Sequence, residues 1–231
     1  MELSATATPL SLYDVLKDRL TKCPLSHNKF LPLDILEDVI TVENVRASAG
    51  SNLKTELLSS NKDLAEEVVR KAKKVYASLV FIERQSVIGA LLSEGLTDEH
   101  LPLSRRRNGP DRNVLSCRCG IKTFETFRSW KSSEVDIFLE KQWQVQAPVF
   151  DTTGSHFNLD PECALPLHPK VEQIGRTAIS RVYKCTLYPA HYPQGFKVSI
   201  TSTSCELIGE LMLMPEGTDR PSSSGNQGYF G

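Results

Sequence analysis

The chain has 231 residues, enough for one or two domains with a hydrophobic core. Apolar residues make up 40% and charged residues 24%, which is typical of a globular protein. A net charge of -1 creates no overall field for nucleic acid or an anionic membrane, and no apolar run is long enough for a transmembrane helix. The N-terminus lacks the basic start and apolar stretch of a secretory signal. We therefore expect a cytoplasmic protein, with the nucleus as alternative, that binds neither nucleic acid nor membrane.

Periodic apolar residues predict a helical region over residues 10–103. A first helix is expected over Leu12–Leu20, with Ser11 in the N-cap position. Pro32 suits the start of a second, short helix. The strongest pattern predicts one long helix from Lys62 to Glu83, because its apolar residues recur at spacings of three and four.

A further helical piece is expected over Val87–Leu92, and Gly95 is a natural C-terminal cap for it. Beyond it, residues 104–133 are interpreted as a linker, because they begin with the basic and turn-rich stretch SRRRNGPDR. A nuclear-import signal is an alternative interpretation of that stretch.

The cysteines are too few and too scattered to predict a disulfide framework. Cys117 and Cys119 form a lone C-x-C, without a second pair at zinc-finger spacing. His156 and His168 follow, but nothing in the sequence brings them to the cysteine pair. We therefore expect ordinary thiols and no metal site.

Residues 134–214 change to shorter, alternating patterns. A short helix is expected over Glu134–Gln142, followed by a half-buried strand through Trp143, Val145 and Ala147. Three further strands are then expected, and Cys205–Met214 is interpreted as a short helix. The expected strands are Val171–Ile174, Arg181–Tyr188 and Phe196–Thr201.

Residues 215–231 are rich in glycine and serine, which predicts a disordered tail. The predicted fold class is therefore α+β, with an N-terminal helical bundle followed by a small antiparallel sheet.

The sheet region carries the functional clue. Ile174-Gly175 and Val182-Tyr183-Lys184, with seven residues from Gly175 to Val182, resemble the glycine-rich loop and second strand of a protein-kinase N-lobe. The segments KQWQVQAPVF, HFNL and YPAHY around them are similar to kinase-like proteins of filamentous fungi. The resemblance covers most of residues 60–201 and implies a partial N-lobe, truncated and degenerate, over residues 134–214.

The resemblance also implies where a nucleotide would bind. The pattern G-x-G-x-x-G-x-V retains only its first glycine, and Thr201 replaces the lysine that holds phosphate in V-A-I-K. Two lysines are conceivable substitutes, so the resemblance implies at most weak binding of ATP. The expected positions are Gly175, Thr177, Ser180, Val182, Lys184 and Lys197.

Neither H-R-D nor D-F-G occurs in the chain, so the catalytic base and the magnesium ligand of a kinase are missing and no catalytic residue is assigned. Too few residues follow the sheet for a helical C-lobe. We expect a non-catalytic, pseudokinase-like signalling or scaffold protein with a protein partner. The alternative is a helical interaction module that binds no nucleotide. An edge left unpaired predicts that the sheet is marginally stable unless the helices or a partner cover it.

Overall fold

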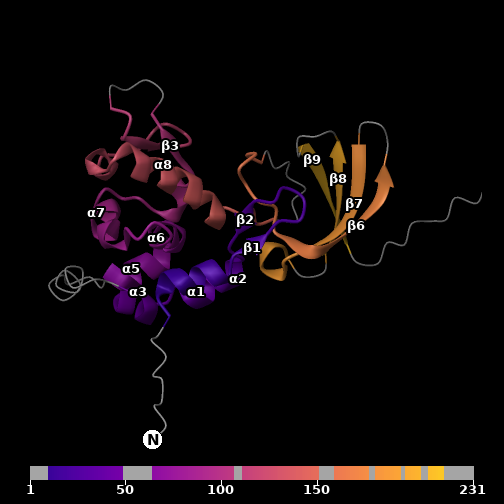
Figure 1. The fold of residues 1–231 in the computed structure, drawn as a ribbon, viewed down its shortest axis with the longest axis horizontal. Coiled ribbons are helices and arrows are strands. Elements are labelled where there is room, and N and C mark those ends of the chain that lie inside the picture. The colour runs from indigo at the N-terminus through magenta and orange to yellow at the C-terminus, as the bar shows by residue number, and fades with distance from the viewer. Residues whose placement is uncertain are drawn as a thin grey trace, which may run out of the picture.

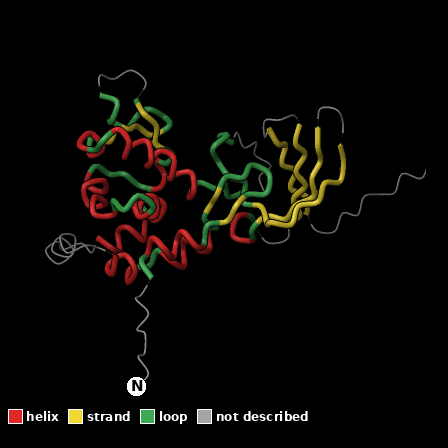
Figure 2. The backbone as a smooth tube through the Cα atoms, in the orientation of Figure 1, coloured by secondary structure: helices red, strands yellow, loops and turns green. Residues whose placement is uncertain are grey.

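The computed structural model describes residues 10–48, 64–106, 111–150, 159–176, 180–193, 196–203 and 208–215. The chain has an α+β fold, as predicted. Helices gather in one half, a four-stranded sheet forms the other, and a small hairpin lies between them (Figure 1). Figure 2 shows the same division, with helices concentrated at one end and the longest strands at the other.

The helical half is built from short α-helices joined by turns and 3-10 segments. The α-helices are α1 (Leu12–Asp18), α2 (Leu33–Val39), α3 (Val42–Ser48), α5 (Leu64–Lys71), α6 (Lys73–Val80), α7 (Ile88–Ser93) and α8 (Ser132–Lys141). The 3-10 segments are η1 (Gln85–Val87), η2 (Asp98–His100), η3 (Thr126–Ser129), η4 (Gln142–Val145) and, next to the sheet, η5 (Pro189–His191).

Two helix ends follow the predicted local chemistry. Ser11 caps α1, since its hydroxyl oxygen accepts the backbone N–H of Asp14 at 3.2 Å. Helix α7 ends before Gly95, whose φ of 76° lies in the left-handed region that glycine adopts freely. Pro32 is the N-cap of α2, one residue ahead of its first helical residue.

The prediction of one long helix over residues 62–83 is wrong. The structure has two helices, α5 and α6, which are separated at Ala72 by a non-helical backbone with φ -144° and ψ 31°. Nearly every side chain of α6 is buried, including the stretch from Val75 to Val80. The break lets α6 turn into the core, whereas α5 keeps the amphipathic surface pattern that the sequence showed.

Residues 104–133 contribute to the core of the helical half, which their composition did not indicate. They include most of a three-stranded antiparallel sheet of β3 (Leu103–Arg105), β4 (Leu115–Cys117) and β5 (Thr123–Phe124). Large apolar side chains from this segment pack in the same cluster as α6 and α7: Leu115, Phe124, Phe127 and Trp130.

Two further expectations about secondary structure are wrong. The predicted strand through Trp143 and Val145 is the 3-10 segment η4, whose residues Gln142 and Val145 are buried against the helical core. The predicted helix over Cys205–Met214 is largely the strand β9 (Ile208–Pro215), which pairs with β8 and covers an edge that would otherwise lack partners. The predicted tail lies outside the described residues beyond Pro215.

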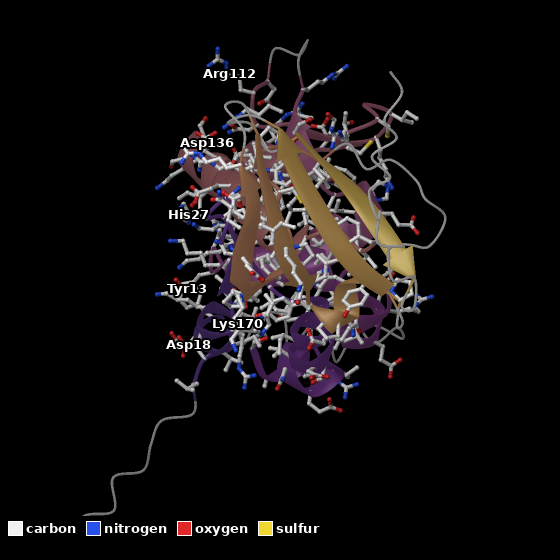
Figure 3. The ribbon with its side chains drawn as sticks, turned by 90° about the vertical axis from the view of Figure 1, so that its right-hand side faces the viewer. Tyr13, Asp18, His27, Arg112, Asp136 and Lys170 are labelled. Atoms are coloured by element: carbon white, nitrogen blue, oxygen red, sulfur yellow. The ribbon has the colours of Figure 1, made fainter. Side chains whose placement is uncertain are left out.

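The large sheet has the strand order β6-β7-β8-β9, and every neighbouring pair is antiparallel. Its other strands are β6 (Leu167–Arg176), β7 (Ser180–Leu187) and β8 (Phe196–Thr203). Figure 3 looks at the molecule from the sheet side and shows these strands standing in front of the helical half, with Lys170 near their lower end.

A second apolar cluster joins the sheet to the N-terminal half. The hairpin of β1 (Thr21–Lys22) and β2 (Lys29–Phe30) contributes Phe30, which packs with Leu167 and Leu187 from the base of the sheet. All three side chains are fully or almost fully buried. The sheet is therefore anchored by residues that lie more than a hundred positions earlier in the chain.

Candidate functional site

The predicted glycine-rich loop is the tip of the β6–β7 hairpin. Gly175 pairs with Val182, and Arg176 pairs with Arg181 at the last register position before the turn. A register shift between Gln173 and Gly175 marks a bulge there. The predicted site residue Thr177 lies outside the described residues, and Ser180 is the first residue of β7.

The register across the sheet gives the neighbours of Thr201, the residue that the resemblance aligns with the kinase lysine. Thr201 pairs with Val182 of β7 on one side and with Glu210 of β9 on the other. Lys197 pairs with Met214, four residues back along β8, which is about 13 Å at the rise of a strand. The structure therefore brings Val182 and Thr201 together and leaves Lys197 at the far end of the strand.

Lys184 lies closer to this position. It is exposed and stands two residues along β7 from Val182, so both occupy the same face of the sheet. Its cross-strand partners are Glu172 on β6 and Ser199 on β8. An opposite charge directly across the strands gives Lys184 an acidic neighbour before any phosphate arrives.

His191 is a buried polar residue beside the sheet that the sequence analysis did not single out. It is 2% exposed and sits in η5, inside the quoted segment YPAHY. Its Nδ1 lies 2.9 Å from the carbonyl oxygen of Pro148, and its Nε2 accepts the backbone N–H of Leu33 at 3.0 Å. Because Nε2 accepts, Nδ1 carries the proton and donates to Pro148. One neutral imidazole thus links η5, which follows β7, to the start of α2 and to Pro148.

A groove of about 700 Å³ lies beside β3 and β4, on the opposite half of the molecule from the predicted nucleotide position. The cysteines of the lone C-x-C line it, with their sulfur atoms 2.7 Å apart. The sequence signal was the C-x-C itself. To predict that this pair lies beside an arginine-lined groove, the β3–β4 pairing would have to be known. The interpretation of this segment as a linker excluded that pairing.

Within the described ranges, no group of three or more His, Cys, Asp or Glu side chains is placed to hold a metal ion; His156 lies outside these ranges. No helix among the described residues combines the length and the apolar character that a bilayer crossing requires. Comparisons of the chain with protein-family models, with curated proteins and with solved structures find no match.

Proposed function

We propose that this chain is a non-catalytic, kinase-like signalling scaffold, related to the kinase-like proteins of filamentous fungi. In this proposal the sheet β6–β9 corresponds to part of a kinase N-lobe. The observation that supports it is the register: Thr201, which the resemblance aligns with the phosphate-binding lysine, pairs directly with Val182. A threonine hydroxyl has no positive charge with which to hold the phosphates of ATP.

Phosphoryl transfer also needs a carboxylate for the acceptor hydroxyl and another for magnesium, and the sequence has neither H-R-D nor D-F-G. Lys184 supplies the nearest alternative cation on the same face, but Glu172 stands opposite to it. These residues support weak nucleotide contact at the hairpin without transfer. The helical half then provides the surface that a protein partner binds.

Nucleotide binding is tested by thermal and urea denaturation of the full chain with magnesium and ATP. If ATP binds with a dissociation constant near 1 mM, about 10 mM ATP raises the free energy of unfolding by about 1.4 kcal/mol. Lys184→Glu should remove this stabilisation. The matched control Lys170→Glu, an exposed lysine near the base of β6, should keep it. No transfer of labelled phosphate is expected from any variant.

Restoring the missing cation gives a sharper test. Thr201→Lys should tighten ATP binding about tenfold, because one charge-assisted hydrogen bond to phosphate is regained. Thr186→Lys, at an exposed position on β7, is the control and should leave ATP affinity unchanged. Equal affinities of the two variants would contradict a kinase-like geometry of the sheet.

One observation favours the alternative, a helical interaction module without nucleotide binding. The larger apolar cluster runs from Leu16 to Val145 and contains no residue of the large sheet. The helical half thus has a core of its own. If ATP stabilises neither the wild-type chain nor Thr201→Lys, the kinase-like scaffold is ruled out. The helical interaction module then takes its place as the proposed function.

A further inference from the structure

A tight turn after β4 holds two thiols against each other. Cys117 is the last residue of β4, and its carbonyl oxygen accepts the N–H of Gly120 at 2.8 Å. The N–H of Cys117 donates to the carbonyl of Lys122 at 3.0 Å, which closes the turn from the other side. Gly120 has a φ of 72°, which favours glycine. This backbone keeps the sulfur of Cys119 2.7 Å from that of Cys117.

The two sulfur atoms differ in their surroundings. Cys117 is 4% exposed, and its sulfur accepts the backbone N–H of Lys122 at 3.3 Å, whereas Cys119 is exposed. The hydrogen bond from the Cys119 thiol, together with backbone N–H groups of the turn, lowers the pKa of Cys117 below that of an ordinary thiol. Burial instead raises the pKa of Cys163 and of Cys185 to about 11.

The groove that reaches this pair carries positive charge. It is lined by Arg105, Arg106 and Arg118 and by one carboxylate, that of Asp160. Arg105 forms an ion pair with Asp136 at 2.6 Å, so its charge is largely neutralised within the protein. Arg106 and Arg118 are exposed at the groove. Their two charges against that of Asp160 favour a small anion beside the thiols.

We propose that Cys117 and Cys119 form a redox-active dithiol that reacts with an anionic low-molecular-weight disulfide of the glutathione class, bound in this groove. The carboxylates of such a disulfide match Arg106 and Arg118. The exposed sulfur of Cys119 is the one that a bound disulfide reaches first, and the buried sulfur of Cys117 lies within reach of the resulting mixed disulfide.

The reaction has two exchange steps. The sulfur of Cys119 attacks one sulfur of the substrate, its proton passes to the Cys117 thiolate, and one substrate thiolate leaves. The substrate thiolate then takes that proton from Cys117. The restored Cys117 thiolate attacks the sulfur of Cys119, and the second substrate thiolate leaves. Two electrons pass from the cysteine pair to the substrate, which becomes one thiol and one thiolate, and the protein gains a Cys117–Cys119 disulfide.

The test treats the reduced full chain with glutathione disulfide and maps peptides by mass spectrometry. In the wild-type chain the peptide with both cysteines should lose two hydrogens and carry no lasting glutathionyl group. Cys117→Ser should trap a glutathionyl group on Cys119, because the second step is blocked. The adduct should form more slowly than wild type reacts, because the thiolate that accepts the Cys119 proton is also lost. Cys119→Ser should react at least tenfold more slowly, as its remaining thiol is buried. Cys163→Ser is the matched control and should behave as wild type.

The positive charge of the groove is tested separately. Arg118→Glu should slow the reaction with glutathione disulfide about fivefold, the effect of one exposed charge interaction, and should not slow the reaction with the cationic disulfide cystamine. The proposal is overturned if the cysteine pair reacts no faster in the native chain than in urea. It is also overturned if Cys117→Ser accumulates no adduct, or if Arg118→Glu slows both disulfides equally.

Discussion

Single polar side chains complete the backbone hydrogen bonding of this protein at places where its elements end. Asp98 lies at the N-terminus of α6, where its two carboxylate oxygens accept the N–H groups of Lys74 and Val75 at 3.1 and 3.0 Å. The helix has no cap of its own, because Ala72 stands in the N-cap position. A residue 26 positions later in the chain thus does the work of a local cap.

Asp98→Ala should therefore lower the free energy of unfolding by about 2 kcal/mol, since two N–H groups of a buried helix lose their acceptor. Asp98→Asn keeps one acceptor oxygen and should cost about half as much. Urea denaturation followed by far-ultraviolet circular dichroism measures both. The neighbouring exposed Glu99→Ala is the control, and a loss of the same size there would argue against capping by Asp98.

His191 predicts a pH dependence. Burial lowers its pKa below the ordinary value, opposed by the hydrogen bond to Pro148 and by Asp34, while Lys74 adds to the lowering. The unfolded chain therefore binds a proton more readily than the folded chain. The stability that His191 contributes is complete above about pH 6.5, the ordinary histidine pKa, and falls as the pH drops from there toward the folded pKa.

The measurement compares the free energy of unfolding at pH 7.5 and 5.5 in the wild-type chain and in His191→Gln, whose amide can donate and accept but does not titrate. The loss on acidification should be smaller in the variant. His168→Gln, an exposed histidine of β6, serves as control and should keep the wild-type loss. If His191→Gln loses as much stability as wild type between pH 7.5 and 5.5, His191 does not cause the pH dependence.

At the scale of elements, the sequence predicts those whose cause is local. The cap at Ser11 and the end of α7 at Gly95 follow from short-range backbone chemistry, and both are confirmed. The break at Ala72 and the strand β9 depend on distant partners, namely Asp98 and β8. Periodicity within one segment carries no information about such partners, so it predicted one long helix and a terminal helix instead.

The same limit applies to the candidate sites. The hairpin between Gly175 and Val182 follows from the alternating pattern, and the structure has it. The groove at Cys117 could be predicted only from the pairing of β3 with β4, which joins segments on either side of a basic, turn-rich stretch. That stretch suggested a linker, because loop composition indicates where the chain turns and not what the flanking strands pair with.

Gln142 supplies an element-scale prediction, because its side chain extends the three-stranded sheet. Its amide oxygen accepts the N–H of Leu103 at 2.7 Å, and its amide nitrogen donates to the carbonyl of Leu103 at 2.8 Å. The side chain is 1% exposed. Gln142→Leu should lower the free energy of unfolding by about 3 kcal/mol, since two buried backbone groups lose their partners.

Gln142→Glu should be at least as damaging, because a carboxylate cannot donate to the Leu103 carbonyl. Gln144→Leu is the control, because the backbone carbonyl of residue 144 accepts the N–H of Leu31 whatever the side chain. Chemical denaturation of the three variants separates the two roles. If Gln142→Leu and Gln144→Leu lower the free energy of unfolding equally, the loss does not come from the hydrogen bonds of the Gln142 amide.

The whole molecule consists of two apolar clusters that meet at the β1–β2 hairpin. Phe30 is fully buried in the second cluster, with its ring edge-on to Tyr188 at 5.5 Å and to His191 at 6.0 Å between centroids. Both partners follow β7 in the chain, so Phe30 is the main aromatic contact from the N-terminal half to the base of the sheet. Stability of the sheet should therefore depend on this one side chain.

Phe30→Ala should remove about 4 kcal/mol from the free energy of unfolding of the sheet, the usual cost of emptying a buried aromatic site. Amide hydrogen exchange should accelerate in β6 and β7 and change little in α6, whose core contains no sheet residue. Phe138→Ala, in the helical core, is the matched control and should give the reverse pattern. If limited proteolysis of Phe30→Ala left a resistant core over residues 130–200, the sheet would be stable without its N-terminal anchor, contrary to this prediction.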